Sequence, residues 1–212
     1  MKKRTEGLSI LLVDLRQAVG HGLDDPSDPH DDEPRDDRAV LRRPRGAGRR
    51  RWSARKARGS AICIDGLNAE RILIAAECVG DGRWFIERAT RYANERVVFN
   101  RPIGQNQGVQ FPIARAHVNV EAADLMRIRA AELFDRGEPC GAEANMAKLL
   151  AADASWEAAN VAVQTHGGFG FAEDYDIERK FRETRLYQVA PISTNLILAY
   201  VAEHVLGLPR SY

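Results

Sequence analysis

The chain has 212 residues, a formal net charge of +1 and 44% hydrophobic residues. This length accommodates one domain or one and a half, with enough apolar residues for a core. A charge so close to zero favours neither a nucleic-acid-binding protein nor a membrane-surface protein. The apolar run Leu8–Val13 is too short for a signal peptide or a membrane span. Because Cys63, Cys78 and Cys140 are widely spaced, we expect reduced thiols in a cytoplasmic protein, without a disulfide framework or metal site.

Two stretches of different character precede residue 63. Residues 5–15 (TEGLSILLVDL) carry an aliphatic, β-branched run after a glycine, which predicts a strand. Residues 24–62 are rich in Asp, Arg, Pro and Gly and contain few aliphatic side chains. Such a segment cannot bury enough apolar surface to order itself, so we expect it to be disordered. The sequence therefore divides into residues 1–23, 24–62 and 63–212.

Helical periodicity dominates the third part of the chain, where apolar residues recur at steps of three and four. The stripe of a first helix comprises Ile72, Ala76, Val79, Ile86, Ala89 and Ala93. That of a second comprises Phe111, Ala114, Val118, Ala122 and Leu125. That of a third comprises Met146, Leu150, Ala154, Ala158 and Val161, and two glycines end it. Shorter helices are expected at about 175–189 and 192–206, with Pro191 in the first turn of the last. Long helices, short polar connections and no strands predict an all-α fold, an antiparallel up-down helix bundle.

Two motifs in this bundle are informative about function. The first is Tyr92–Gln107 (YANERVVFNRPIGQNQ), and the second is Gln164–Gly170 (QTHGGFG). Adjacent glycines allow the backbone to approach a ligand closely, and a Gln just before them can reach the same ligand. In this order and spacing, the two motifs resemble the C-terminal helical domain of the acyl-CoA dehydrogenases, a family of FAD enzymes. Residues 1–23 resemble the end of the family's β-barrel domain, so we expect a chain truncated on its N-terminal side.

The same resemblance suggests a second explanation for residues 24–62. Codons for Asp25–Leu41 read one base later, and codons for Arg51–Ile62 read two bases later, permit strings similar to the family's barrel-to-helix linker. We therefore hypothesise that this segment is translated out of frame. The alternative is a natural linker, in which Arg42–Arg58 would form a basic patch for nucleic acid or an acidic partner. That patch has a single aromatic residue, Trp52, and so lacks the stacking platform of single-strand binders.

The family's reaction removes a proton next to an acyl-CoA thioester and passes a hydride to FAD, which requires a carboxylate base. Most members place a Glu before the last helix, where this chain has Pro191. A minority place the base on the first long helix, in a Leu-x-x-Glu-Arg context that matches Leu67–Arg71. The resemblance therefore implies that Glu70 is the base, with Asn68 and Arg71 near the CoA moiety. The alternatives are a solvated acid in the first turn of a helix for Glu70 and an ion pair for Arg71.

The resemblance also implies the contacts with FAD. Arg96 and Phe99 match residues that face its pyrophosphate and adenosine, where an Arg fork suits phosphate. Asn100 follows, where the family usually has Gly. The remaining implied contacts are Gln107, Gln164, Gly167, Gly168, Ser193 and Asn195. Residues 164–168 match a loop that reaches FAD from the neighbouring subunit. The alternatives are an ordinary helix C-cap for the glycines and a solvated charge for Arg96.

The partners implied by the resemblance are an acyl-CoA substrate, an electron-transfer flavoprotein or similar acceptor, and further copies of the chain in a homotetramer. Because most of the family's barrel and its N-terminal helical domain have no counterpart here, a second interpretation stays open. In that interpretation the chain is a non-catalytic helical oligomerisation module that kept the bundle and lost the chemistry.

Overall fold

The computed structural model describes residues 11–12, 51–52 and 59–210. It divides into two units between Asp65 and Gly66. In the first unit, β1 (Leu11–Leu12) pairs antiparallel with β2 (Arg51–Trp52), and Leu11 lies opposite Trp52. β1 falls inside the strand predicted at 5–15. The rest of that strand and the out-of-frame hypothesis for residues 24–62 lie almost entirely outside the described residues.

The second unit is built around α2 (Gly59–Glu95), a helix of 37 residues whose first turns belong to the first unit. A short hairpin follows, in which β3 (Val97–Val98) pairs with β4 (Arg101–Pro102). The sequence predicted no strand here, because each strand has only two residues and no alternating pattern can be recognised at that length. Phe99 and Asn100 form the turn with φ of 51° and 63°, the pair of positive angles typical of a two-residue type I′ hairpin.

Two long helices follow the hairpin and the 3-10 turn η1 (Ile103–Gln105). They are α3 (Gln107–Asp135) and α4 (Gly141–His166). Because only five residues connect them, they are antiparallel neighbours. Gly137, in this connection, has a φ of 67° that other residues rarely adopt.

The C-terminal part contains shorter elements, near the two predicted short helices. They are η2 (Gly167–Phe171), η3 (Glu173–Tyr175), α5 (Ile177–Thr184), η4 (Arg185–Gln188), α6 (Thr194–Tyr200) and the π-helical turn η5 (Val201–Val205). Pro191 was expected inside the last helix but precedes it. Ser193 caps α6 instead, because its Oγ accepts a hydrogen bond from the Leu196 amide at 3.4 Å.

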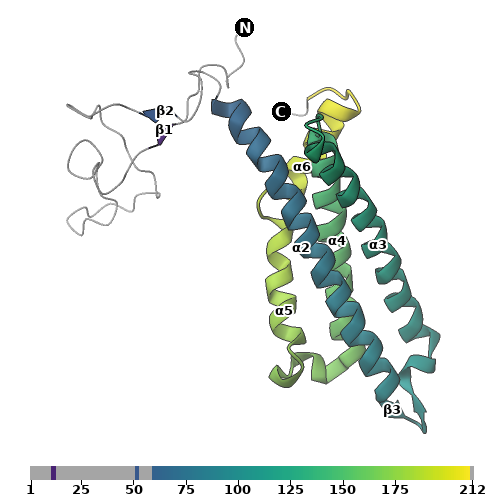
Figure 1. Ribbon diagram of the computed structural model, residues 1–212. Helices are drawn as coiled ribbons and strands as arrows, with labels where there is room; N and C mark the ends of the chain where they lie inside the picture. Colours follow the sequence, from purple (N-terminus) through teal and green to yellow (C-terminus); the bar gives the residue numbers. More distant parts are fainter. Residues whose placement is uncertain (1–10, 13–50, 53–58, 211–212) are drawn as a thin grey trace, which may run out of the picture. The chain divides into compact units, whose positions relative to one another are not determined.

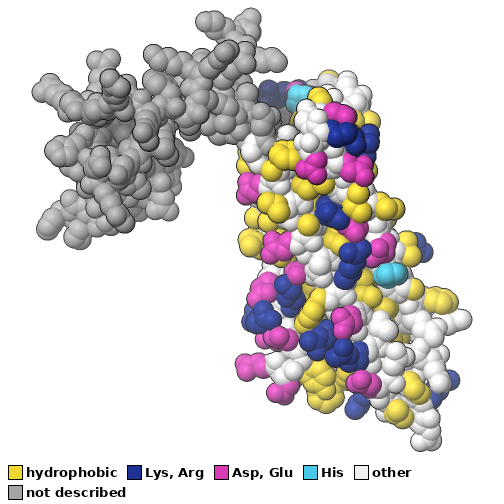
Figure 2. Space-filling view, viewed as in Figure 1, with side chains coloured by type: hydrophobic (Ala, Val, Ile, Leu, Met, Phe, Trp, Pro, Cys, Tyr) yellow, Lys and Arg dark blue, Asp and Glu magenta, His cyan; other side chains and the backbone are white. Residues whose placement is uncertain are grey.

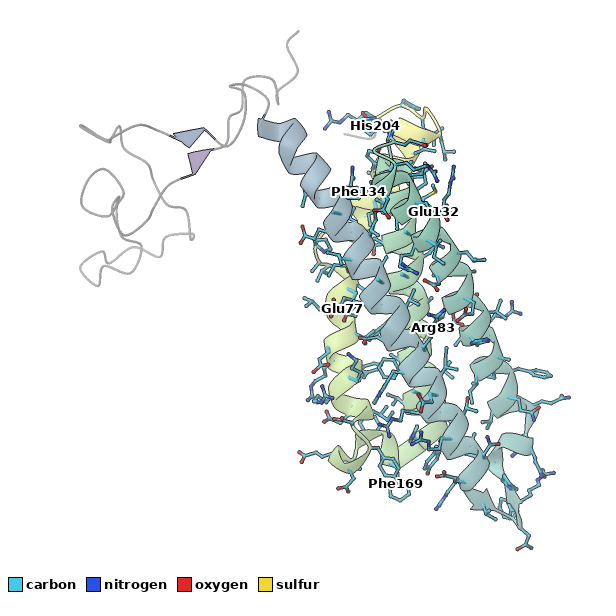
Figure 3. The ribbon with its side chains drawn as sticks, viewed as in Figure 1. Glu77, Arg83, Glu132, Phe134, Phe169 and His204 are labelled. Atoms are coloured by element: carbon cyan, nitrogen blue, oxygen red, sulfur yellow. The ribbon has the colours of Figure 1, made fainter. Side chains whose placement is uncertain are left out.

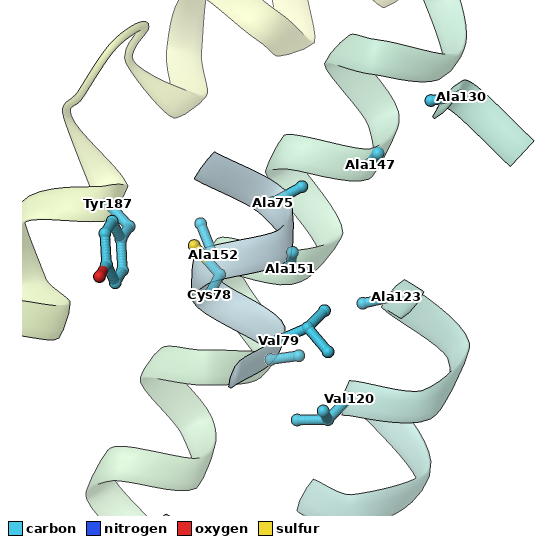
Figure 4. Packing of buried hydrophobic residues seen from close by; sticks show 11 residues of the cluster. Ala75, Cys78, Val79, Val120, Ala123, Ala130, Ala147, Ala151, Ala152 and Tyr187 are labelled. Carbon is cyan, nitrogen blue, oxygen red and sulfur yellow. The ribbon is translucent and has the colours of Figure 1, made fainter. Parts of the chain in front are cut away.

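α2, α3, α4 and α5 run side by side with alternating direction (Figure 1), which confirms the predicted all-α antiparallel bundle. The core between them consists largely of small side chains, and Figure 4 shows Ala75, Ala123, Ala147 and Ala151 at the meeting surfaces of three helices. Small residues let the helix axes approach closely. At Gly82 a methyl group would lie 2.7 Å from a Val120 methyl, so glycine is required there by packing.

The apolar stripe predicted for the second helix lies on the wrong side of α3. Phe111, Val118 and Leu125 are 61%, 59% and 71% exposed, whereas Val120 and Leu133 of the same helix are buried. α3 therefore carries two apolar faces, of which the described residues cover only one. Periodicity identifies an apolar face but does not say what covers it.

Charged side chains of both signs are interspersed over the visible face of the bundle, with apolar side chains between them (Figure 2). From α2, Arg83 reaches toward α3 (Figure 3), where it pairs with Glu121 and Asp124 at 2.9 Å each. Exposed pairs of this kind contribute about 0.2–1 kcal/mol each, so the alanine core is the stronger determinant of the fold. None of the described helices combines the length and the apolar character needed to cross a membrane.

Candidate functional site

The residues implicated by the sequence fall into two groups at opposite ends of α2. Glu70 lies near its beginning, and Arg96 follows directly after its last residue. At about 1.5 Å per helical residue, the two positions are separated by about 38 Å. We describe the end that carries Arg96 first.

At this end the structure brings together Arg96, Gly167 and Gly168. They line a pocket of about 580 Å³ with residues from α2, the hairpin and η2. The complete lining is Tyr92, Arg96, Val98, Ile103, Thr165, His166, Gly167, Gly168, Phe169 and Ala172. Among these residues, Arg96 alone carries a full charge near neutral pH. The Arg96 guanidinium lies 5.7 Å from the centre of the Phe169 ring, a ring that Figure 3 places at this end of the bundle. The pocket therefore offers one cation beside aromatic and backbone surface.

The three glycines of the motif have different reasons to be glycine. Gly167 has φ 58° and ψ −130° and ends α4, so the C-cap alternative holds for this residue. At Gly170 a methyl group would lie 2.9 Å from the Val163 carbonyl oxygen, so packing within the chain excludes a side chain. At Gly168 a methyl group would meet no described atom within 4 Å, and the backbone has no positive φ. Of the three glycines in this motif, only Gly168 has no reason within the described residues to lack a side chain.

The hairpin tip presents Phe99, which is 94% exposed and has a φ of 51°. A bulky residue in this conformation costs roughly 1–3 kcal/mol, and such strain is concentrated at ligand sites. Asn100 next to it has a φ of 63°, a region that Gly and Asn tolerate best. The backbone at this position is therefore compatible with the Asn that the sequence has. Gln107 is the first residue of α3, and Gln164 lies exposed in the last turn of α4, but neither lines the pocket.

His166 forms the inner wall of the pocket. It is buried, its Nδ1 lies 2.8 Å from the Ala162 carbonyl oxygen, and its ring stacks on Tyr92 at 4.3 Å. Burial lowers the pKa of His166 below its ordinary value, so the ring is neutral near neutral pH. These contacts give the buried ring a polar partner inside the chain. Sequence reasoning missed the aromatic residues around His166, because only the turn made by η2 and η3 brings Tyr175 and Phe169 together there.

At the other end of α2, Glu70 is exposed and Arg71 is 8% exposed. The Arg71 Nη1 donates to the Asn68 Oδ1 at 2.9 Å, so these two residues contact each other. The Arg71 Nε is buried without a hydrogen-bond partner among the described residues. Burial lowers the pKa of Arg71, whereas Tyr200 and Glu70 oppose this shift. A buried cation with an unpartnered donor is suited to an anionic or carbonyl ligand.

Two further residues join this end of the bundle and were missed by sequence reasoning. A methyl group at Gly141 would lie 3.1 Å from the Tyr200 hydroxyl and 3.9 Å from the Asn68 Oδ1, so α6 and the start of α4 border Asn68. The Asn145 Nδ2 donates to the Gly141 carbonyl at 2.7 Å, while its buried Oδ1 has no described partner. Tyr200 and Asn145 look like ordinary helix residues in the sequence, and only the tertiary packing reveals them.

Ser193 and Asn195 lie at the start of α6, where Ser193 is half-buried and Asn195 is exposed. The segment before them is held by α4, because the buried Lys148 donates to the Ile192 carbonyl at 2.9 Å. Lys148 occupies the first half of α4, about 30 Å along the helix from Gly168. Ser193 and Asn195 therefore do not share the pocket with Arg96. Within residues 66–210 no group of three or more His, Cys, Asp or Glu residues is arranged to hold a metal ion.

Comparisons with known proteins agree with this fold. The family described as "Acyl-CoA dehydrogenase, C-terminal domain" matches residues 57–206. Acyl-CoA dehydrogenase FadE12 of Mycobacterium tuberculosis is 47% identical over 149 residues, which cover 69% of this chain and 38% of that protein. An acyl-CoA dehydrogenase of Bacillus subtilis is 40% identical over 149 residues, covering 70% and 39%.

Among solved structures, a glutaryl-coenzyme A dehydrogenase in complex with glutaryl-CoA is similar with a TM-score of 0.69 and 31% identity. The similarity covers 76% of this chain and 41% of that one. The chain thus spans about two fifths of the length of the relatives it matches. Since the family match covers more than half of its residues, the chain belongs to the acyl-CoA dehydrogenase family.

Proposed function

We propose that this chain supplies the helical part of an FAD-dependent acyl-CoA dehydrogenase, which removes a proton and a hydride from adjacent carbons of an acyl-CoA thioester. The observation that carries this proposal is the pocket in which Arg96 faces Gly167 and Gly168, in a chain of this family. FAD, when bound, would accept the hydride, and the residues of the chain would bind FAD, orient the substrate and take the proton.

The residues at the pocket fit a flavin nucleotide. Among the side chains described in residues 66–210, no carboxylate pairs with Arg96, so its planar fork is available to a pyrophosphate. Gly168 leaves open space where the backbone can approach a ligand. We assign Phe99, Gln107 and Gln164 to the adenosine side. Ser193 and Asn195 are assigned to FAD at the other end of the bundle.

Glu70 is the proposed base. Its carboxylate lies one residue from the buried Arg71, and Pro191 at the alternative position has no group that accepts a proton. We assign the unpartnered Arg71 Nε and the neighbouring Asn68 to the acyl-CoA, because no described carboxylate forms an ion pair with this buried guanidinium. In this assignment Arg71 holds the thioester end of the substrate near the Glu70 carboxylate.

One chain does not bring the base and the Arg96 pocket together, because about 38 Å of helix separates them. We therefore propose that each complete site combines the Glu70 end of one chain with the Arg96 end of a neighbour, in a homotetramer. The exposed apolar stripe of α3 supports self-association, because Phe111, Val118 and Leu125 lie on one face without cover from the described residues.

The acyl-CoA substrate and an electron-transfer flavoprotein as acceptor belong to the same proposal. A flavoprotein whose structure is titled "Electron transferring flavoprotein of Acidaminococcus fermentans" is similar over 73% of this chain, with a TM-score of 0.71 and 30% identity. A glutaryl-CoA complex is known for another similar structure. A cytoplasmic location is also proposed, on the cysteine pattern and on Cys78, which is a buried thiol.

A second candidate is a non-catalytic oligomerisation module of the same family. The observation in its favour is the apolar face of α3, which the described residues leave uncovered. A module of this kind would assemble without binding flavin.

Titration of the 212-residue chain with FAD, followed by flavin fluorescence, separates the two functions. We expect saturable binding, and we expect Arg96→Gln to weaken it about 10- to 100-fold, because a charge-assisted contact is lost. Arg91→Gln is the matched control, since Arg91 lies near the end of α2, five residues before Arg96, and pairs with Glu87 on the surface. Equal affinity of the two variants, or no binding by the unsubstituted chain, would favour the module.

A further inference from the structure

Lys148 is the most deeply buried cation in the described part of the chain. Its side chain has no exposed surface, and its ammonium donates to the backbone carbonyls of Tyr187 and Ile192, the second at 2.9 Å. Burial lowers the pKa of Lys148 below its ordinary value. An apolar side chain of similar size would fill the same space without the cost of burying a charge. The location of its two acceptors therefore needs an explanation.

Both acceptors belong to one short stretch of chain, the connection from η4 to α6. The carbonyls of Tyr187 and Ile192 flank residues 188–191, so a single ammonium group holds both ends of this connection. A carbonyl without a partner in such a place would be costly, so the contact fixes the backbone path. Lys148 thus ties the connection to the middle of the bundle.

A second anchor acts on the same connection from α2. The Tyr187 hydroxyl donates to the Asp81 Oδ2 at 3.1 Å, and the Thr184 hydroxyl donates to the same oxygen at 3.3 Å. The Lys180 ammonium pairs with the other Asp81 oxygen at 2.7 Å. Asp81 and Lys148 therefore hold the side chain and the carbonyl of Tyr187 from two different helices.

The connection leads directly into the start of α6. Thr194 follows Ser193, and its hydroxyl donates to the Gln188 carbonyl at 3.3 Å, which closes the connection on itself. Ser193 comes immediately after Ile192, whose carbonyl Lys148 holds. The position of Ser193 and Asn195 is consequently set by a backbone path that Lys148 fixes.

We propose that Lys148 is a positioning residue, which sets the start of α6 so that Ser193 and Asn195 can contact FAD. This inference rests on the proposed function for the role of Ser193 and Asn195, and on the hydrogen bonds of Lys148 for the positioning itself. Lys148 does not touch the ligand in this arrangement. It acts through the connection at residues 187–192.

The test is a double-variant cycle on the affinity of the 212-residue chain for FAD. Lys148→Met keeps the length of the side chain and removes its charge and donors, and Ser193→Ala removes the proposed contact. We expect each to weaken binding about tenfold. If Lys148 acts through Ser193, the second substitution should add nothing to the first. The affinity of the double variant for FAD should then equal that of the single variant with the lower affinity. Multiplicative effects of the two substitutions would overturn the inference.

Val120→Ala and Lys148→Arg are the controls. Val120→Ala loosens the core between α2 and α3, where Val120 faces Gly82, and we expect it to lower the unfolding midpoint but keep FAD affinity. Lys148→Arg keeps the charge and several donors, and we expect it to recover part of the affinity. If Lys148→Met does not fold, Lys148→Gln takes its place in the cycle, since it retains one donor group. Equal affinity of Lys148→Met and Val120→Ala would overturn the inference.

Hydrogen exchange separates failure of this inference from failure of the proposed function. If the unsubstituted chain does not bind FAD, the proposed function fails, and exchange alone decides about Lys148. We expect Lys148→Met to raise amide exchange selectively in residues 187–196. The comparison is with Val120→Ala, under conditions in which the two variants have the same unfolding midpoint. An even rise over α2, α3 and α4 would show that Lys148 only stabilises the bundle.

Discussion

The two ends of α2 differ in how much of a site this chain completes by itself. At the Arg96 end, residues of α2, β3, η1, α4 and η2 line one pocket within a single chain. At the Glu70 end, an exposed carboxylate lies beside a buried guanidinium with an unpartnered donor. The Arg96 end already forms a pocket, whereas the Glu70 end presents reactive groups that the described residues do not cover. This contrast is the reason for proposing a site shared between chains.

The largest expected effect is on turnover, and it comes from Glu70→Gln, because this substitution removes the proposed base. In a chimera that joins residues 63–212 to the preceding part of FadE12, we expect Glu70→Gln to lower kcat by about 10²- to 10⁴-fold while FAD stays bound, since an amide cannot accept the proton. Steady-state turnover of an acyl-CoA and the flavin absorbance are measured together. Glu87→Gln, at an exposed position on the same helix, should leave turnover unchanged. A Glu70→Gln chimera of normal activity would show that the base lies elsewhere.

A methyl group at Gly168 should perturb only the Arg96 end. Gly168 has open space around it and no positive φ, so we expect Gly168→Ala to leave the unfolding midpoint nearly unchanged. FAD affinity should fall about tenfold, because the methyl group keeps the ligand from the backbone. Gly80→Ala, at an equally open position of α2, should raise stability by about 0.5–1 kcal/mol and leave affinity unchanged. Unaltered FAD affinity of Gly168→Ala would remove the main reason for placing the ligand at this glycine.

The smallest expected effect is a change in stability with pH, which we assign to His166 at the Arg96 end. Because burial lowers the pKa of His166, the unfolded chain binds this proton more readily than the folded chain. The contribution of His166 to stability is therefore complete above its ordinary pKa of about 6.5 and is lost progressively as the pH falls below it. Urea unfolding at pH 7.5 and 5.5 should show this loss, and His166→Gln should reduce it. His204→Gln, at an exposed site, should not; an equal pH dependence in both variants would contradict the role of His166.

The bundle was predictable because its helices are long and their periodicity extends over many turns. The stripe of α3 shows the limit of that approach. Phe111, Val118 and Leu125 are more apolar than the alanines of the opposite face, so the pattern points to the more hydrophobic face and not to the one that this chain buries. The partners of Arg83 could not be predicted either, because they lie 38 and 41 residues away in the sequence, on another helix.

The site was predictable only where motifs are local. Gly167 and Gly168 stand next to each other in the sequence, and the pocket brings Arg96 to them. Tyr200, Asn145 and Lys148 were not predictable, because each is an ordinary helical residue until the packing of α4 and α6 gives it a partner. The strained turn at Phe99 was also hidden, since a positive φ is not expected of a bulky residue.

The most direct test of a shared site is complementation between two inactive chimeras, one with Glu70→Gln and the other with Arg96→Gln. If each site takes Glu70 from one chain and Arg96 from its neighbour, a mixed pair contains one site with both substitutions and one site with neither. Coexpression of the two chimeras in equal amounts should then restore about a quarter of the unsubstituted turnover by random pairing. Turnover no greater than the sum of the two variants, in assemblies shown by two affinity tags to contain both chains, would contradict the shared site.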